Sequence, residues 1–408
     1  MIERPRGTRD FSPEEMDARS WLEDVLRRKV KDFGYSEILT PTFEHTQLFM
    51  EKSGPSIVEE IYSFKDKGGR EIALRPEFTA SVMRMYSDSL KGEPKPLKLF
   101  YFGPAFRYER PQSGRYREFW HFGTEMIGAD TPRADAENIA LAYDCMRETG
   151  LDNIKMKISN LQILENFLEE RGLSHEERED VYHLIDKEED VEVIKDRYDL
   201  DEEFSLLLET PFEELDDLLG ELSSYKYLRE VMDKLRYYDI EKDDYQIDLS
   251  TVRGLDYYSG VVFEIDAGGL GAQKQICGGG DYNLSDIFNV NVSSKGFAIG
   301  FDRLLLALDK EGELPETERE GCYVIPMGEE TFEYAYEVLS LLRKNHKKAD
   351  IDLKGRGIGK SLGFADKAGF KYSLIIGEDE VKNNEVALKD MVSGEQRSID
   401  KEKIMGAL

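Results

Sequence analysis

The chain has 408 residues, 40% of them hydrophobic, which is enough for roughly two to four domains with true cores. Its formal charge of −29 excludes a generally basic surface that coats nucleic acid, although a local basic patch could still bind RNA.

Three cysteines, Cys145, Cys277 and Cys322, lie far apart in the sequence and without the spacing of metal ligands. We therefore expect three buried thiols in a reducing, cytoplasmic compartment and no metal site built by the protein alone. No apolar run is long enough to span a bilayer, and the first residues lack the apolar core of a signal peptide, so we expect no membrane association.

The first 160 residues mix helical and strand-like patterns. Ser12-Pro13-Glu14-Glu15 is a helix start with a capping box, and apolar residues at helical spacing follow it until Gly34. A strand-like segment through Ile38 and Leu39 ends at Pro41. The same criteria predict strands over 72–74, 97–102 and 154–158, and a helix over 133–149.

From 161 to 240 the sequence becomes rich in Leu and Glu at helical spacing, with 26 acidic residues against 9 Lys and Arg. Strand-forming residues return at 245–249 and 263–265. This order predicts a helical module inserted into an antiparallel α+β domain, with the acidic side chains on a solvated face.

Residues 312–319 have the composition of a linker, and the pattern changes after them. The predicted strands are 321–326, 349–353, 371–376, 384–390 and 396–400, and the predicted helices are 330–345 and 359–368. The alternation predicts a small α/β domain with a largely parallel sheet. The domain prediction is 1–160 with 241–315, then 161–240, then 318–408.

A predicted hairpin carries charged residues between aromatic ones. Its first strand sends Arg107 and Glu109 to one face, because side chains two apart point the same way, and its return strand does so with His121 and Glu125. These groups could hold a phosphate and a cationic amine together; a salt-bridge ladder on an exposed hairpin is the alternative.

Two further segments carry an arginine beside groups that suit a ligand. The run 253–258, Arg-Gly-Leu-Asp-Tyr-Tyr, suggests a pocket floor with one cation and two rings. The run 296–303 is a glycine-spaced strand that enters a helix, and Arg303 falls in the first helical turn, where free N–H groups favour anions. With Arg107, these arginines could hold a triphosphate.

Together these segments resemble the class II aminoacyl-tRNA synthetases, and most closely the histidyl-tRNA synthetase family. The three class II motifs correspond to the strand ending at Pro41, the Arg107-x-Glu109 hairpin and the strand ending at Arg303. Segments typical of the histidine family are 4–10, 75–79, 253–258 and 277–282. The resemblance covers essentially the whole chain. It implies an antiparallel class II sheet flanked by helices, a helical insertion and a C-terminal α/β anticodon-binding domain.

The resemblance implies that the enzyme joins L-histidine to ATP as histidyl-adenylate and then transfers histidine to the 3′ end of tRNA(His). It implies that Arg107 and Arg253 hold the α-phosphate, Arg253 standing where other class II enzymes use a metal ion. It further implies that Arg115 and Arg303 hold the outer phosphates and that Glu109 faces the adenine. Arg253, Arg107 and Arg303 are the expected catalytic residues, and Mg²⁺ is expected on the phosphates.

The resemblance also implies a histidine pocket. Its expected residues are Glu77 and Thr79 near the ammonium, Glu125, Tyr257, Tyr258 and Tyr282 around the ring, and also Phe78 and His121. The family usually has glutamine in place of His121, whose charge we expect to vary with pH near neutrality. A purely structural role for His121 is the alternative. Asp281-Tyr282-Asn283 replaces the usual Arg-Tyr-Asp, which inverts one local charge.

Expected tRNA contacts lie in two places. Gly355–Ser361 resembles a phosphate-binding loop but is one residue too short, so we interpret 343–360 as a basic edge that meets tRNA phosphates; a solvated charge cluster is the alternative. Expected tRNA-binding residues are Lys354, Arg356 and Lys360, with Arg110 and Gln112 in the hairpin loop. The resemblance also implies a homodimer built through the first motif.

Two other functions stay open at this point. One is a regulatory relative of the synthetase fold that binds histidine without charging tRNA; such proteins usually lack the 253–258 run and the anticodon domain. The other is a class II synthetase for a different amino acid.

Overall fold

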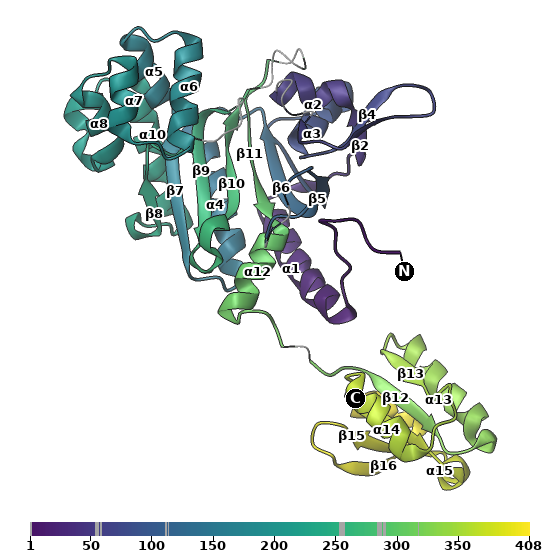
Figure 1. The fold of residues 1–408 in the computed structure, drawn as a ribbon. Coiled ribbons are helices and arrows are strands. Elements are labelled where there is room, and N and C mark those ends of the chain that lie inside the picture. Colours follow the sequence, from purple (N-terminus) through teal and green to yellow (C-terminus); the bar gives the residue numbers. More distant parts are fainter. Residues whose placement is uncertain are drawn as a thin grey trace. The chain divides into compact units, whose positions relative to one another are not determined.

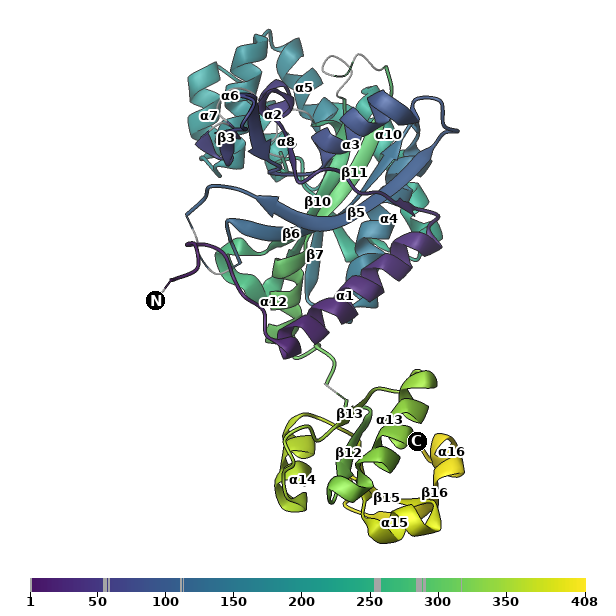
Figure 2. The same ribbon diagram turned by 90° about the vertical axis from the view of Figure 1, so that its right-hand side faces the viewer.

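The computed structural model describes residues 2–53, 57, 59–110, 112, 114–252, 258–283, 288, 291–316 and 318–408. These form two compact units, Met1–Pro315 and Glu316–Leu408, which are drawn in Figures 1 and 2. In the described part of the chain, no helix is both long and apolar enough to cross a membrane.

The first unit is built on an eight-stranded sheet with the order β1-β5-β6-β11-β10-β9-β7-β8. Its strands are β1 (Ser36–Glu37), β5 (Leu97–Phe106), β6 (Glu118–Ile127), β7 (Ile154–Asn160), β8 (Tyr245–Ile247), β9 (Tyr258–Ala267), β10 (Gln275–Tyr282) and β11 (Ser294–Gly300). The six central strands pair antiparallel, and only the edge strands β1 and β8 pair parallel to their neighbours. The predicted antiparallel α+β domain is confirmed.

The strand predicted through Ile38 and Leu39 is wrong by two residues. β1 covers Ser36–Glu37, and Ile38 adds one backbone hydrogen bond to Phe100 O at 2.9 Å before the chain leaves the sheet. Leu39 is exposed, so its apolar character reflects no burial in this sheet.

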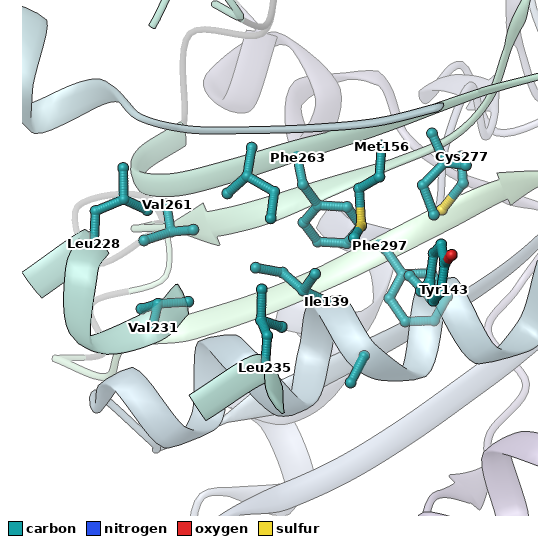
Figure 3. Packing of buried hydrophobic residues seen from close by; sticks show 14 of the residues in the cluster. Ile139, Tyr143, Met156, Leu228, Val231, Leu235, Val261, Phe263, Cys277 and Phe297 are labelled. Carbon is teal, nitrogen blue, oxygen red and sulfur yellow. The ribbon is translucent and has the colours of Figure 1, made fainter. Parts of the chain in front are cut away.

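Helices cover one face of the large sheet. They include α1 (Pro13–Asp32), which begins with the predicted Ser12–Glu15 capping box, and α4 (Pro132–Glu148), which packs on α1 and on β9–β11. Figure 3 shows Ile139 and Tyr143 of α4 against the strand residues Phe263, Cys277 and Phe297. This core fixes the sheet, so the opposite face is held in shape for a ligand.

Smaller elements complete the first unit around that opposite face. A three-stranded sheet has the order β2-β4-β3, with β2 (Phe43–His45), β3 (Ser63–Lys65) and β4 (Glu71–Leu74). The helices beside it are α2 (Thr46–Ser53) and α3 (Thr79–Met85), the latter continuing into a π-helical turn at Tyr86–Leu90. The helix α12 (Phe301–Glu311) follows β11 directly.

Six helices fill the sequence between β7 and β8, and they gather at one end of the sheet (Figures 1 and 2). They are α5 (Leu161–Glu170), α6 (His175–Asp186), α7 (Val191–Tyr198), α8 (Glu202–Glu209), α9 (Asp216–Leu219) and α10 (Ser223–Leu235). The last of them, α10, packs against α4 and shares its core with the sheet, as Leu228, Val231 and Leu235 do in Figure 3. The helices therefore belong to the same compact unit as the sheet.

The second unit has a five-stranded sheet with the order β13-β12-β14-β15-β16. Its elements are β12 (Cys322–Pro326), α13 (Phe332–Lys344), β13 (Ala349–Ile351), α14 (Ile358–Lys367), β14 (Tyr372–Ile376), α15 (Glu378–Asn383), β15 (Glu385–Asp390), β16 (Gln396–Asp400) and α16 (Ile404–Ala407). The prediction of a largely parallel sheet is wrong. β12 pairs parallel with β13 and β14, but β15 and β16 are joined by a short turn and so pair antiparallel.

The three cysteines, Cys145, Cys277 and Cys322, are all buried, as expected.

Candidate active site

A cavity lies over the face of the large sheet that α1 and α4 leave open, and it is lined by side chains from several segments. Of the residues expected to bind histidine or ATP, those that line it are Glu77, Phe78, Thr79, Arg107, Glu109, Arg115, His121, Glu125, Tyr258, Tyr282 and Arg303. Arg253 and Tyr257 lie outside the described residues.

The floor of the cavity is largely main chain. Every second residue of β11 faces the cavity, namely Gly296, Ala298 and Gly300. Gly278 of β10 pairs with Ala298 and lies beside them. A side-chain atom added at Gly296 would lie 2.1 Å from Thr124 O and 2.4 Å from a carboxylate oxygen of Glu125. The glycine-spaced strand of the sequence therefore folds into a surface on which a flat ligand can lie directly on backbone.

The cavity has two chemically different ends along β6. His121 pairs with Gly300, where β11 passes into α12 and Arg303, whereas Glu125 pairs with Gly296 further along the same strands. Four residues of strand separate the two side chains by about 13 Å. Below, the region around Glu125 is called the carboxylate end, and the region around Arg303 the arginine end.

At the carboxylate end, Glu125 is almost fully buried and held by two tyrosines. Tyr282 Oη donates to Glu125 Oε2 at 2.5 Å, and Tyr101 Oη donates to Oε1 at 3.4 Å. Tyr101 in turn stacks on Phe78, with ring centroids 4.3 Å apart. Tyr101 was not predicted as a site residue, because a tyrosine in an apolar strand gives no signal that separates a pocket wall from a core.

Glu77 and Thr79 lie where α3 begins. Glu77 Oε1 accepts a hydrogen bond from Ala80 N at 3.2 Å. Just before them, buried Arg75 donates to Thr40 O and Pro104 O, both at 2.9 Å, and lies over the Phe78 ring. Burial lowers the pKa of Arg75 to about 10. Arg75 thus ties this corner of the cavity together without lining it.

At the arginine end, three guanidinium groups come from the hairpin and from α12. Arg303 Nε donates to Gly114 O and Arg303 Nη1 to Gln275 O, each at 3.0 Å. Burial, and then the charges of Arg115 and Arg107, lower the pKa of Arg303. Mutually repelling cations held on one cavity wall favour an anionic ligand.

Glu109 is engaged by the protein itself at this end. It contacts the Arg115 guanidinium directly and lies 4.0 Å from Arg107 Nη1. The hairpin therefore carries its own counter-charge, and ion pairs of the kind expected for a salt-bridge ladder are present on it.

His121 lies on β6 at the side of the arginine end, and the expectation that it titrates near neutrality is wrong. Burial, and then the positive charges of Arg107, Arg303 and Arg75, lower the pKa of His121 to about 3. Its Nδ1 atom is buried and has no hydrogen-bond partner among the described residues. His121 is thus a neutral imidazole with hydrogen-bonding capacity to spare at the cavity wall.

Behind the arginine end, Asp302 joins the N-terminal segment to α12. Its Oδ1 atom lies 2.7 Å from Arg9 Nη2 and 2.6 Å from Arg19 Nη1, and its Oδ2 accepts from Trp120 N at 2.8 Å. The sequence alone assigned no role to Asp302, because Arg9 and Arg19 are almost 300 positions away from it.

The residues expected to meet tRNA are less uniform. Arg110 and Gln112 are exposed in the hairpin loop, and Lys354 and Lys360 are exposed in the second unit. Arg356 differs, because its Nη1 lies 2.6 Å from the buried Asp352 and its guanidinium lies over Phe364. Much of the charge of Arg356 is therefore compensated within its own unit.

An antiparallel sheet with helices on one face, a hairpin arginine and a second arginine in the helix after a glycine-spaced strand define a class II aminoacyl-tRNA synthetase. The comparisons identify which one. The family model for histidyl-tRNA synthetase matches residues 7–304, and the anticodon binding domain model matches residues 321–408. The chain therefore belongs to the histidyl-tRNA synthetase family, as its motifs indicated.

Full-length relatives support the same family assignment. The histidine–tRNA ligase of Archaeoglobus fulgidus is 44% identical over 418 residues, covering 100% of this chain and 99% of the relative. That of Methanocaldococcus jannaschii is 42% identical, covering 98% and 97%. The apo S. aureus histidyl-tRNA synthetase structure is 32% identical with a TM-score of 0.76, covering 100% and 99%. The activity is thus ATP-dependent ligation of histidine to tRNA, and the regulatory and other-amino-acid alternatives are set aside.

Proposed function

We propose that the carboxylate end of the cavity binds L-histidine, that the arginine end binds ATP, and that the two meet beside His121. The observation that carries this proposal is the register of β6 with β11: the buried carboxylate of Glu125 is opposite Gly296, and His121 is opposite Gly300, where the chain enters the helix that carries Arg303, at a spacing that suits two joined substrates.

At the carboxylate end, Glu125 is suited to an imidazole N–H. It is buried, and Tyr282 already orients it. A hydrogen-bonding site of this kind strongly rejects side chains that lack the partner group, because its own polar atoms would then be left unpaired. In this proposal Tyr257 and Tyr258 complete the ring site, Glu77 and Thr79 receive the ammonium, and Phe78 lines the same pocket.

At the arginine end, Arg107 and Arg253 hold the α-phosphate in this proposal, Arg115 and Arg303 hold the outer phosphates, and Glu109 is on the adenine side. A carboxylate oxygen of histidine attacks the α-phosphorus. The bond between the α-phosphorus and the oxygen that bridges it to the β-phosphorus then breaks, and diphosphate leaves. The 3′-terminal hydroxyl of tRNA then attacks the acyl carbon and releases AMP. Fixed guanidinium groups lower the first barrier because they meet the charge that gathers at phosphorus.

His121 contributes a neutral imidazole between the two substrates. Its unpartnered Nδ1 supports a hydrogen bond to substrate, and its pKa of about 3 supports a donor or acceptor role without net charge. A cationic group there would compete with the ammonium of histidine, so depression of this pKa suits the site.

Mg²⁺ on the phosphates fits the residues present. In the parts of the chain that the structure describes, no group of three or more His, Cys, Asp or Glu side chains could hold a metal ion alone. Mg²⁺ keeps several waters and binds largely through substrate phosphates, so it needs no cage built by the protein alone. When bound, Mg²⁺ would neutralise charge on the phosphates.

The remaining parts of the proposal concern the macromolecule and the assembly. The sheet domain, 1–160 with 241–315, carries the chemistry, 161–240 is its helical insertion, and 318–408 reads the anticodon of tRNA(His). Lys354, Lys360 and, with part of its charge compensated, Arg356 meet tRNA phosphates, as do Arg110 and Gln112 in the hairpin loop. The active form is a cytoplasmic homodimer.

The test is histidine-dependent exchange of diphosphate into ATP. Arg107→Ala, Arg303→Ala and Arg253→Ala should each lower the exchange rate by about a hundredfold or more, since one preorganised electrostatic contact contributes on this scale. Arg133→Ala, an exposed arginine on α4, is the matched control and should exchange normally. Near-normal exchange in the cavity variants, with the fold intact, would refute the assigned roles.

A further inference from the structure

A buried charged cluster lies on the other face of the sheet, behind the carboxylate end of the cavity. Lys295 of β11 has a fully buried ammonium whose Nζ lies 2.5 Å from Asp135 Oδ1 and 3.0 Å from Asp281 Oδ1. Asp135 stands in the first turn of α4, and Asp281 is opposite Lys295 on β10. The cluster therefore joins a helix to two strands of the cavity floor.

A fourth residue connects this cluster to the inserted helices. Tyr227 of α10 donates from its hydroxyl to Asp135 Oδ2 at 2.6 Å. Burial, and then Asp135, raise the pKa of Tyr227, so the phenol keeps its proton and stays a donor. Asp135 thus accepts from the insertion on one oxygen and from Lys295 on the other.

The cluster also accounts for the Asp281 departure. Asp281 stands where the family usually has arginine, and its carboxyl group contacts Lys295 directly across the strand pair. Burial and the neighbouring Asp135 raise the pKa of Asp281 well above its usual range. Burial opposes the charge of Lys295, but Asp281 and Asp135 outweigh it and raise the pKa of Lys295. Lys295 is therefore a permanent cation at this point.

Asp281 transmits its position to the cavity through backbone. Its Oδ2 accepts from Val261 N at 3.2 Å, three residues after Tyr258 at the start of β9. The next residue along β10 is Tyr282, which pairs with Tyr258 across the two strands and donates to Glu125. The side chains of Asp281 and Tyr282 point to opposite faces of the sheet, as strand geometry requires. A shift of Asp281 would therefore move both tyrosines of the carboxylate end.

We propose that Lys295 is a positioning residue for histidine binding: held by Asp135 and Asp281, it fixes the strand ends that carry Tyr258 and Tyr282, and Tyr227 makes that position depend on the helical insertion. The inference rests on the proposed assignment of the carboxylate end to histidine. It predicts a defect in histidine binding without a matching defect in ATP binding, which a general loss of stability would not give.

The first test removes one oxygen atom at a time. Tyr227→Phe should raise the KM for histidine about three- to tenfold in diphosphate exchange and leave the KM for ATP within about twofold, because displacements below roughly 1 Å at a site have effects up to about a hundredfold. Tyr143→Phe is the matched control, since Tyr143 of α4 donates in the same way to Asp244 at 2.7 Å but has no link to Asp281. Equal effects of the two variants, or parallel rises in both KM values, would overturn the proposal.

The second test is a rescue. Lys295→Leu should raise the KM for histidine by more than about tenfold, and adding Asp281→Arg should restore it to within about threefold, because an arginine at 281 returns one cation beside Asp135. Failure of the double variant to restore histidine binding would contradict the role of the cation. If Lys295→Leu alone does not fold, the double variant and Tyr227→Phe still give the decision.

The variant Glu125→Gln distinguishes a failure of this inference from a failure of the proposed histidine site on which it rests. An unchanged KM for histidine in Glu125→Gln would remove the histidine site itself. A raised KM for histidine in Glu125→Gln, together with a normal KM for histidine in Tyr227→Phe, would support the histidine site and contradict only the positioning role of the cluster.

Discussion

Acidification should destabilise the first unit through His121. The pKa of this imidazole is about 3 in the folded protein against a usual 6.5, so the unfolded chain takes up the proton first. The stability that depends on a neutral His121 is complete above about pH 6.5 and is lost as the pH falls toward 3. Between about pH 7 and pH 5 the loss from this one group is about 2 kcal/mol.

The assay compares the wild-type chain with His121→Gln in urea at both pH values. Both tryptophans, Trp21 and Trp120, lie in the first unit, so their fluorescence follows that unit without a contribution from the second. Other groups titrate equally in the two proteins. The free energy of unfolding of the variant should therefore fall by about 2 kcal/mol less than that of the wild type.

Nuclear magnetic resonance gives a direct check on the same residue. The imidazole signal that disappears in His121→Gln should hold its chemical shift between about pH 5 and pH 8 in the wild type. Diphosphate-exchange profiles of the two proteins should also have the same shape over that range. A His121 midpoint near 6.5, or equal pH dependence of stability in both proteins, would refute the reasoning about burial and neighbouring cations.

Three further results are expected. Gly296→Ala should abolish histidine-dependent exchange, because the new methyl group would overlap the strand and the carboxylate beside it. The control is Gly92→Ala, which has open space around it and should change stability by less than about 0.5 kcal/mol. Normal exchange in Gly296→Ala would contradict the main-chain floor. Asp302→Asn should lower the free energy of unfolding by about 3 kcal/mol or more in denaturant titrations, since it leaves the buried Arg19 and the partly buried Arg9 without their counter-charge, and a loss below about 1 kcal/mol would argue against that pairing. Lys354→Ala with Lys360→Ala should weaken tRNA binding and reduce the salt slope by about two in a filter assay, and an unchanged slope would exclude phosphate contact.

Local patterns predicted the parts of the site that are made by one continuous segment. The capping box at Ser12, the glycine-spaced strand before Arg303 and the shared face of His121 and Glu125 follow from local patterns that the sequence displays directly. The resemblance to a family then supplied the substrates, which no periodicity contains.

The sequence alone did not predict which charged residues meet when they are far apart along the chain. The inverted charge at Asp281 was visible as a departure, but the partner that compensates it, Lys295, could be identified only once β10 and β11 were in register. The pKa of His121 failed as a prediction for a related reason, because burial and three distant arginines act together on it. Electrostatics of this kind depends on the packed fold, whereas residue type alone suggests a titrating imidazole.

The main-chain floor at Gly296, Ala298 and Gly300 has a consequence for how the enzyme can vary. Peptide groups offer the same donors and acceptors whichever residue carries them, and at Gly296 even an added methyl group would overlap Thr124 O and the Glu125 carboxylate. A change of substrate preference therefore requires changes in the side chains of the surrounding walls on β6, β9 and β10, while the main-chain floor stays the same.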